Sequence, residues 1–143
     1  MTIARLIADR SSDVWSCHAD DSVADAVAIL ATKRIGALPV RDGNEDVAGI
    51  FSERDVLYSL KQHGADALGM KVRDTMTAPA VTIAPETPVL EALALMTRRR
   101  IRHLPVIENG RMTGFVSIGD LVKYRIDHIE AEASALRDYI QMA

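Results

Sequence analysis

A seven-residue pattern, Gly-x-x-Ser-x-x-Asp, occurs twice in the chain, at 49–55 and at 114–120. In each copy the glycine lies within an apolar segment, and the serine precedes a stretch with helical periodicity. A serine at a helix N-cap with an acidic residue three positions later is typical of a capping box. The same residues could bind a nucleotide, because exposed N–H groups and a hydroxyl receive phosphate while the carboxylate accepts hydrogen bonds from a ribose diol. One copy alone is compatible with either interpretation.

The pattern belongs to a longer internal duplication. A shift of 66 residues places 22–40 over 88–106, and the identical residues include the Leu-Pro-Val runs at 38–40 and 104–106. Beyond a one-residue deletion the shift is 65, and there the two Gly-x-x-Ser-x-x-Asp copies coincide. A solenoid would need at least about three shorter repeats. We therefore predict two similar halves that bury their apolar faces against each other.

Each half is predicted to contain a strand, a helix, two strands and a second helix. The first helices show apolar residues at i, i+3, i+4 and i+7, with Ser22 or Thr87 as cap and Pro88 at the first helical position of the second copy. The expected strands cover 13–17, 35–40 and 47–51 in the first half, and 80–83, 101–107 and 112–116 in the second. The second helices start at Ser52 and Ser117, and the chain ends in one long helix over 121–140.

Composition excludes several classes of protein. The chain has 143 residues, 48% of them hydrophobic, and a formal net charge of −3, which argues against a general nucleic-acid binder. Its single cysteine, Cys17, excludes an internal disulfide and a cysteine-rich zinc framework. No apolar run approaches the roughly 20 residues that span a bilayer, and the N-terminus does not resemble a secretion signal. We expect a cytoplasmic protein that does not insert into membranes.

The repeated helix, the following (Ile/Val)-x-x-Leu-Pro-Val and Gly-x-x-Ser-x-x-Asp together resemble the cystathionine-β-synthase (CBS) domain, here as the tandem pair called a Bateman module. The segment VRDTMTAPAVTI at 72–83 is similar to the usual start of a second repeat. The resemblance implies a mixed fold, α+β or α/β, of two pseudo-symmetric β-α-β-β-α repeats packed sheet to sheet. The predicted divisions are repeat 1 at 10–60, a linker at 61–75, repeat 2 at 76–127 and a C-terminal helix extension at 128–143.

The resemblance further implies a regulatory protein that binds AMP, ADP, ATP, NAD(H) or S-adenosylmethionine, forms a homodimer and signals to a partner protein in trans. Each ligand cleft would combine the Gly-x-x-Ser-x-x-Asp end of one repeat with the first two strands of the other. The first cleft would then contain Ile50, Ser52, Arg54, Asp55, Val81, Thr82, Arg102, His103, Leu104 and Pro105. The second would contain Ser16, Cys17, Gly36, Ala37, Leu38, Pro39, Phe115, Ser117 and Asp120.

The two expected clefts differ in charge. Arg54, Arg102 and His103 fall in the first, whereas Gly119, Gly36 and Ala37 stand at the matching positions of the second. Cationic donors compensate phosphate charge, and arginine does so best. The first cleft is therefore expected to bind phosphate more strongly, and the second to offer uncharged space.

Other functions are conceivable for several short segments of the chain. The basic run at 98–103 lacks the interleaved aromatic residues that favour nucleic-acid binding, so it is interpreted as a solvated helix end that leads into the first cleft. The stretch 42–46 lacks the glycine and glutamate of a calcium loop and is interpreted as a turn. Cys17-His18 lacks further metal ligands nearby, and no nucleophile–base pair is evident, so no metal and no catalytic residue is predicted. A nucleotide-processing enzyme and a structural dimeric adaptor remain the alternatives to a ligand sensor.

Overall fold

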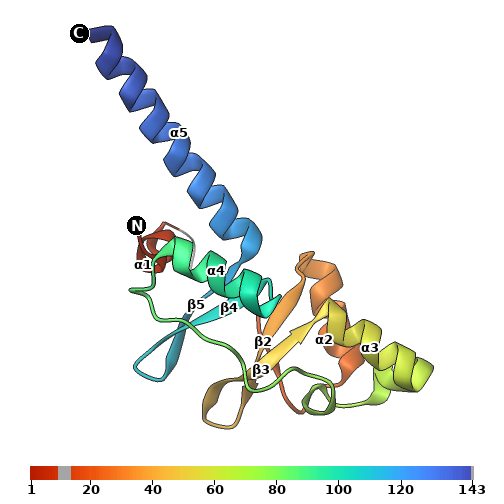
Figure 1. The fold of residues 1–143 in the computed structure, drawn as a ribbon. Helices are drawn as coiled ribbons and strands as arrows, with labels where there is room; N and C mark the ends of the chain where they lie inside the picture. The colour runs from red at the N-terminus through yellow and green to blue at the C-terminus, as the bar shows by residue number, and fades with distance from the viewer. Residues whose placement is uncertain (10–13, 143) are drawn as a thin grey trace.

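The computed structural model describes residues 1–9 and 14–142, which form two small α+β halves and a long projecting helix (Figure 1). The first half has a three-stranded sheet in the order β1-β2-β3, and the second has a two-stranded sheet, β4-β5. The strands are β1 Cys17–His18, β2 Ala37–Asp42, β3 Glu45–Ser52, β4 His103–Glu108 and β5 Arg111–Ser117. The helices are α1 Ile3–Ala8, α2 Val23–Lys33, α3 Glu53–His63, α4 Val89–Arg99 and α5 Ile118–Met142, with short 3-10 helices η1 Gly64–Gly69 and η2 Val72–Asp74. Strand β3 of one sheet contacts β5 of the other, so the predicted pairing of two α+β repeats is confirmed.

The predicted first helices of both halves are present. At α2 the Ser22 hydroxyl accepts a hydrogen bond from Asp25 N at 3.1 Å, as a capping residue should. At α4 the N-cap is Pro88 rather than Thr87, so that expectation was wrong by one residue. Both helices end at an arginine in the left-handed conformation, Arg34 (φ 53°) and Arg100 (φ 54°). The duplication therefore extends to the backbone geometry that follows each helix.

The predicted opening strands are the least accurate part of the secondary structure. β1 consists of Cys17 and His18, which pair in parallel with Val40 and Arg41, and residue 13 of the expected strand lies outside the described residues. The expected strand at 80–83 is reduced to one bridge, in which Ile83 N donates to Pro105 O at 3.0 Å. Pro79 and Pro85 flank this segment, and because proline lacks an N–H it cannot extend a hydrogen-bonded ladder.

The segment that leads into each half packs on the other half. Ile3 N donates to Thr87 O at 2.9 Å, and Ile3 is buried in the core of the second half. In the matching contact Val72 N donates to Asp21 O at 2.9 Å, and Val72 is buried in the core of the first half. The segment 61–75, which was expected to be a linker, contains the end of α3 at His63 and the two short helices η1 and η2. This exchange ties the two halves together.

Two glycines make the crossing of these leading segments possible. A Cβ atom on Gly49 would lie 2.7 Å from the Thr77 carbonyl oxygen, and one on Gly114 would lie 2.7 Å from Ile7 Cδ1. Such distances are shorter than real Cβ contacts allow. The glycine of each Gly-x-x-Ser-x-x-Asp copy therefore permits the close approach of a leading segment to the strand.

Candidate functional site

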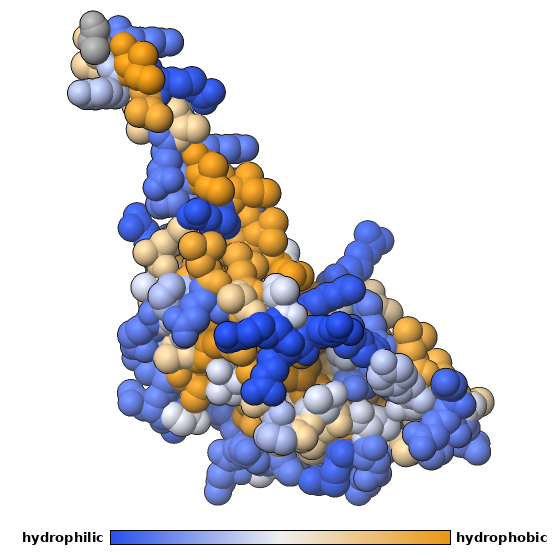
Figure 2. Space-filling view, viewed as in Figure 1, coloured by the Kyte–Doolittle hydropathy of each residue, from blue (hydrophilic) through white to orange (hydrophobic). Residues whose placement is uncertain are grey.

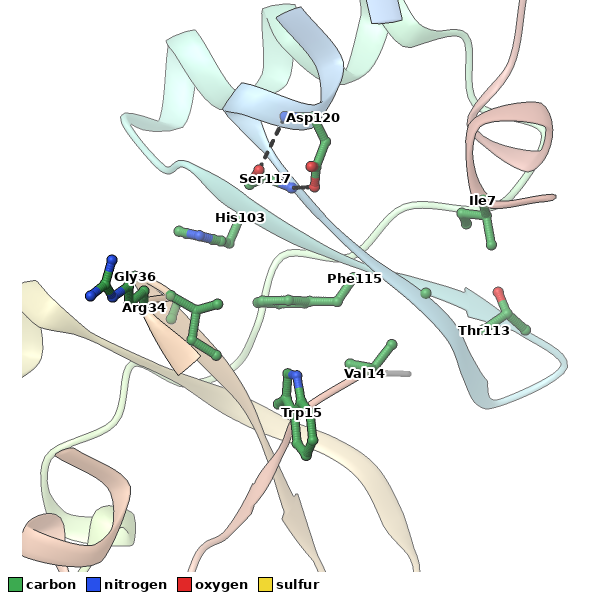
Figure 3. A pocket seen from close by; sticks show the side chains of 13 residues that line it. Ile7, Val14, Trp15, Arg34, Gly36, His103, Thr113, Phe115, Ser117 and Asp120 are labelled. Carbon is green, nitrogen blue, oxygen red and sulfur yellow. Dashed lines mark hydrogen bonds between the residues drawn. The ribbon is translucent and has the colours of Figure 1, made fainter. Parts of the chain in front are cut away.

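A cavity of about 330 Å³ lies between the two halves (Figure 3). This volume falls within the range of small-molecule sites, about 300–1,000 Å³. The first half lines it with Val14, Trp15, Arg34, Ile35, Gly36 and Ala37. The second half contributes His103, Thr113, Gly114, Phe115, Ser117 and Asp120, and Ile7 of α1 completes the wall.

Ser117 and Asp120 stand where β5 leads into α5, at one end of the cavity. Ser117 N donates to Asp120 Oδ2 at 2.8 Å, and Asp120 N donates to Ser117 Oγ at 3.1 Å. The pair is thus a capping box, as the structural interpretation of the sequence pattern requires. Both side chains also line the cavity, so capping and ligand binding are compatible roles for the same residues.

An aromatic surface forms one wall of the cavity. The rings of His103 and Phe115 stack with their centroids 5.5 Å apart and their planes at 13°. Antiparallel pairing brings them together, because His103 lies opposite Ser117 and Pro105 opposite Phe115. Burial lowers the pKa of His103, while the nearby carboxylates of Asp120 and Glu53 act in the opposite direction. Burial thus favours the neutral form of the imidazole.

Positive charge at the first-half side of the cavity comes from Arg34, and Lys33 lies over the ring of the lining residue Trp15. Arg34 lines it from the left-handed residue that ends α2, and the Nζ atom of Lys33 lies 3.8 Å from the centroid of the Trp15 ring. Gly36 and Ala37 alone predict uncharged space here. Arg34 supplies positive charge two residues earlier. Arg34 and Arg100 occupy equivalent places in the duplication, and that recurrence was the available signal.

The second predicted cleft is assembled only in part. Gly36, Ala37, Phe115, Ser117 and Asp120 line the cavity. The remaining members of the set lie elsewhere: Cys17, Leu38 and Pro39 are buried, and Ser16 Oγ accepts a hydrogen bond from Arg41 Nε at 3.3 Å. Burial, with a smaller contribution from Asp21, raises the pKa of Cys17 to about 12. Val14 and Trp15 line the cavity in place of Ser16 and Cys17, a shift that sequence spacing alone did not show.

Both oxygens of the Asp55 carboxylate accept hydrogen bonds from groups of the protein. Asp55 Oδ2 accepts hydrogen bonds from Ser52 N at 2.9 Å and from Ser52 Oγ at 3.1 Å. Asp55 Oδ1 accepts one from Thr77 Oγ1 at 2.9 Å, and the residue is only 8% exposed. Two backbone hydrogen bonds of 2.9 Å between Ile50 and Thr77 hold the leading segment of the second half in this place. Ile50, Ser52 and Asp55 are thus close together, with Thr77 over them.

The other residues predicted for the first cleft do not gather around Asp55. His103 lines the Asp120 cavity instead. Arg54 Nη1 donates to the Arg100 carbonyl oxygen at 3.4 Å, and Arg102 is exposed. Leu104 belongs to the core of the second half with Val81 packed against it, Pro105 is buried, and Thr82 is exposed. The predicted positive charge is therefore divided between the two clefts, with His103 in the second.

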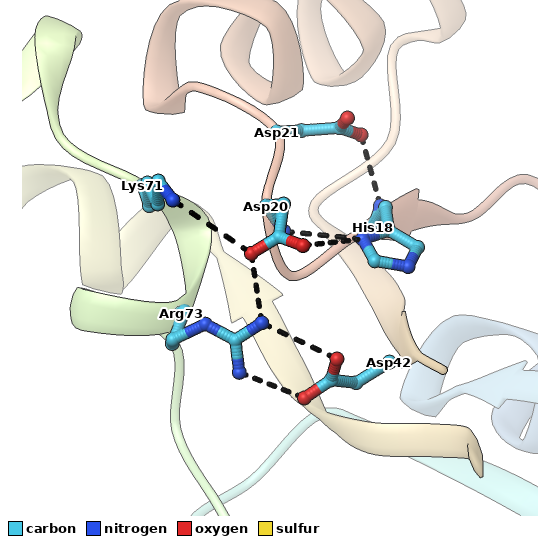
Figure 4. A network of polar contacts seen from close by, with 6 residues as sticks. All are labelled: His18, Asp20, Asp21, Asp42, Lys71 and Arg73. Carbon is cyan, nitrogen blue, oxygen red and sulfur yellow. Dashed lines mark hydrogen bonds and ion pairs between the residues drawn. The ribbon is translucent and has the colours of Figure 1, made fainter. Parts of the chain in front are cut away.

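A separate polar cluster connects the leading segment of the second half to the first half (Figure 4). Arg73 Nη1 and Nη2 donate to the two Asp42 oxygens at 2.8 and 3.3 Å, and Nη2 also donates to Asp20 Oδ1 at 2.8 Å. These contacts lower the pKa of both Asp20 and Asp42. Lys71 Nζ lies 3.9 Å from Asp20, and His18 N donates to Asp21. The cluster fixes the segment that ends at Thr77.

The CBS domain family matches the chain twice, at 7–62 and at 72–127, and the chain belongs to that family. It is 43% identical over 132 residues to the mitochondrial CBS domain-containing protein CBSX3 of Arabidopsis thaliana, a match that covers 90% of this chain and 64% of that protein. The chain thus spans less than two thirds of that relative's length.

Solved structures of CBS-domain proteins share the fold. One from Agrobacterium tumefaciens superposes with a TM-score of 0.82 at 36% identity, over 87% of this chain and 92% of the other. The structure of CBSX2 in complex with AMP superposes with a TM-score of 0.75 at 25% identity, over 88% and 96% of the two chains. Within residues 1–9 and 14–142, none of the helices combines the length and apolar character that crossing a bilayer requires.

Proposed function

We propose that this protein is a regulatory module that binds an adenosine nucleotide in the cavity between its two repeats. The observation that carries the proposal is the cavity of about 330 Å³, where Ser117 and Asp120 of one repeat lie beside Arg34 and Gly36 of the other. A related CBS-domain structure is a complex with AMP, which supports this ligand class.

Each part of a nucleotide has a chemical counterpart among the lining residues. The Asp120 carboxylate can accept hydrogen bonds from a ribose diol, and Ser117 begins the helix at the same place. The stacked rings of His103 and Phe115 offer an apolar surface to the base. Arg34 supplies a planar cationic donor for phosphate. AMP is the smallest ligand that engages all three, and ADP, ATP and NAD(H) share the same groups.

The residues around Asp55 constitute a second, weaker proposed site. Thr77 Oγ1 already donates to Asp55 Oδ1, so a ribose hydroxyl at that oxygen must replace this hydrogen bond. A ligand that displaces a well-made contact gains only the difference between the two interactions. We therefore expect the Asp55 site to fill only at high nucleotide concentration.

We propose a binding module rather than an enzyme, with the signal passed to a partner protein in trans. Both repeats line the cavity, so a ligand that binds one relative arrangement of them better shifts the population toward it. Incubation with ATP, ADP or NAD followed by product analysis tests the distinction, because turnover would show an enzyme. No increase in thermal stability with any adenosine nucleotide would instead favour the structural adaptor.

Calorimetric titration with AMP and adenosine tests the assignment of the cavity. Asp120→Ala should weaken both ligands by roughly 10–150-fold, as expected for a lost charge-assisted hydrogen bond. Arg34→Met should weaken AMP much more than adenosine, because adenosine lacks the phosphate. Arg111→Met, a change at an exposed residue of β5 outside the cavity, is the control and should alter neither affinity. Equal losses for AMP and adenosine in Arg34→Met would contradict the placement of the phosphate.

A further inference from the structure

Helix α5 projects from the second half and carries a row of exposed apolar side chains, which Figure 2 shows along its length. Ile129 is 46% exposed, Leu136 60% and Ile140 64%, and Val122 and Ile126 are exposed as well. Apolar side chains gathered in this way on a surface mark an interaction site more often than scattered ones do. We call the row Val122, Ile126, Ile129, Ala133, Leu136 and Ile140 the α5 stripe.

The α5 stripe is not an extension of the face that packs on the core. Leu121 is fully buried and Tyr124 packs against the core of the second half, so these residues define the inward face of α5. At 3.6 residues per turn, the centre of the stripe lies about 120° around the helix from that face. The stripe therefore faces away from its own domain.

The spacing within the α5 stripe alternates between four and three residues from 122 to 140. Apolar residues at alternating spacings of four and three occupy the a and d positions of a heptad repeat, which is the seam of a left-handed coiled coil. The neighbouring positions on both sides are mostly charged, so the apolar band is narrow. A narrow band of this kind suits the packing of one further helix.

The charges beside the stripe select the direction of that helix. Arg125 and Glu132 lie on one side of the stripe, and Glu130 and Arg137 on the other. In a parallel, in-register pair, each residue of the first side faces the residue five positions later on the other helix. Arg125 then faces Glu130 of the second copy, and Glu132 faces Arg137 of the second copy. Both pairs are attractive.

An antiparallel pair with the same apolar contacts has the opposite result. Glu130 would face Glu130 of the second copy, and Glu132 would face Glu132 of the second copy. Arg137 would lie opposite Lys123, so this pair too would carry like charges. Like charges at flanking positions disfavour an arrangement and thereby select its alternative.

We propose that α5 pairs with α5 of a second copy as a parallel, two-stranded coiled coil in register. The two nucleotide modules then lie at the same end of the assembly, side by side. The pairing rests on α5 alone and does not depend on the proposed ligand.

Sedimentation equilibrium of the full chain tests the pairing through Ile129→Glu, which places a carboxylate in the stripe. This change should halve the mass of the assembly and weaken association at least about 100-fold, as expected for the loss of a buried isoleucine. Ala131→Glu, on the opposite face of the same helix, is the control and should leave the mass unchanged. A wild-type monomer at micromolar concentration, or an unchanged mass for Ile129→Glu, would overturn the proposal and leave the stripe for a different partner.

Arg137→Glu tests the direction of the helices at an exposed position. In the parallel pair it creates two contacts between glutamates and should weaken association about 10-fold. A second change, Glu132→Arg, restores opposite charges and should recover most of the affinity. In an antiparallel pair Arg137→Glu would face Lys123 and strengthen association, a result that would overturn the parallel arrangement.

Discussion

Thr77 Oγ1 donates a 2.9 Å hydrogen bond to Asp55 Oδ1, so the leading segment of the second repeat is bonded to the first turn of α3 in the first repeat. Asp55 and Asp120 are the equivalent aspartates of the duplicated pattern. Asp55 is covered by a threonine of its own chain, whereas Asp120 lines the cavity of about 330 Å³. One repeated pattern thus yields two different environments.

Thr77→Val should destabilise the protein, because it removes the hydroxyl donor while it keeps the shape of the side chain. A buried carboxylate oxygen left with one hydrogen bond fewer costs about 1–3 kcal/mol in the free energy of unfolding. Urea denaturation measures this change. Thr82→Val, at an exposed residue of the same segment, is the control and should have little effect. Equal stability of Thr77→Val and wild type would show that the contact does not fix the segment.

The Arg73 cluster should make stability depend on acidic pH. Hydrogen bonds from Arg73 lower the pKa of Asp20 and Asp42 in the folded state. The unfolded protein then binds more protons below the ordinary aspartate pKa of about 3.9, so this stability is present above that pH and is lost as pH falls through the folded values. Arg73→Met should flatten the dependence between about pH 5 and pH 2. Arg111→Met is the control. An identical pH profile for Arg73→Met and wild type would show that the hydrogen bonds from Arg73 do not cause the pH dependence.

His103 should titrate below the ordinary histidine range. Burial lowers its pKa, so between the folded value and about 6.5 the unfolded protein binds the proton and stability falls as pH falls. The imidazole resonance of His103 followed by NMR measures this pKa directly. AMP should lower the pKa of His103 further, because a base stacked on the ring buries the imidazole more deeply. An unchanged pKa in the presence of saturating AMP would argue against a base stacked on this ring.

Cys17 should resist thiol reagents in the folded protein. It is buried in the core of the first half, and its pKa is raised to about 12, so almost no thiolate is present at pH 8. Ellman's reagent should therefore react with Cys17 slowly under native conditions and at once in urea. Fast reaction of the native protein would show that β1 opens readily.

The sequence predicted those features that local spacing encodes. Ser22 caps α2 as expected, and Ser52 and Ser117 accept from Asp55 N and Asp120 N. These elements depend on residues three or four positions apart, which a single sequence shows directly. The duplication also revealed the two halves, because a comparison of the sequence with itself shows it directly.

The exchange of leading segments was not predicted, and several of the predicted site residues are grouped differently in the structure. Val72 packs in the first half and Ile3 in the second, contacts that join distant parts of the chain and leave no periodic signal. The grouping of His103 with Asp55 assumed that the second strand of one repeat always serves the other repeat's cleft. Antiparallel pairing instead places His103 opposite Ser117 of its own repeat. Trp15 was missed because the opening strand was expected at 13–17. In the structure β1 covers only Cys17–His18, and Trp15, which precedes it, lines the cavity.

Titration of the protein with AMP, compared between wild type and Gly36→Val, tests the central claim most directly. A Cβ atom on Gly36 would make ordinary contacts, at 3.4 Å from His103 Cε1 and 3.7 Å from Glu53 Oε1, so the backbone accepts a side chain whose methyl groups occupy the cavity. Overpacking a site typically costs about 1–3 kcal/mol, so Gly36→Val should bind AMP roughly 10–100-fold more weakly while its thermal stability without ligand stays close to wild type. Asp55→Asn, which alters the other repeat, should retain most of the affinity. Wild-type affinity for AMP in Gly36→Val would contradict the account, because the nucleotide would then bind outside the cavity between the repeats.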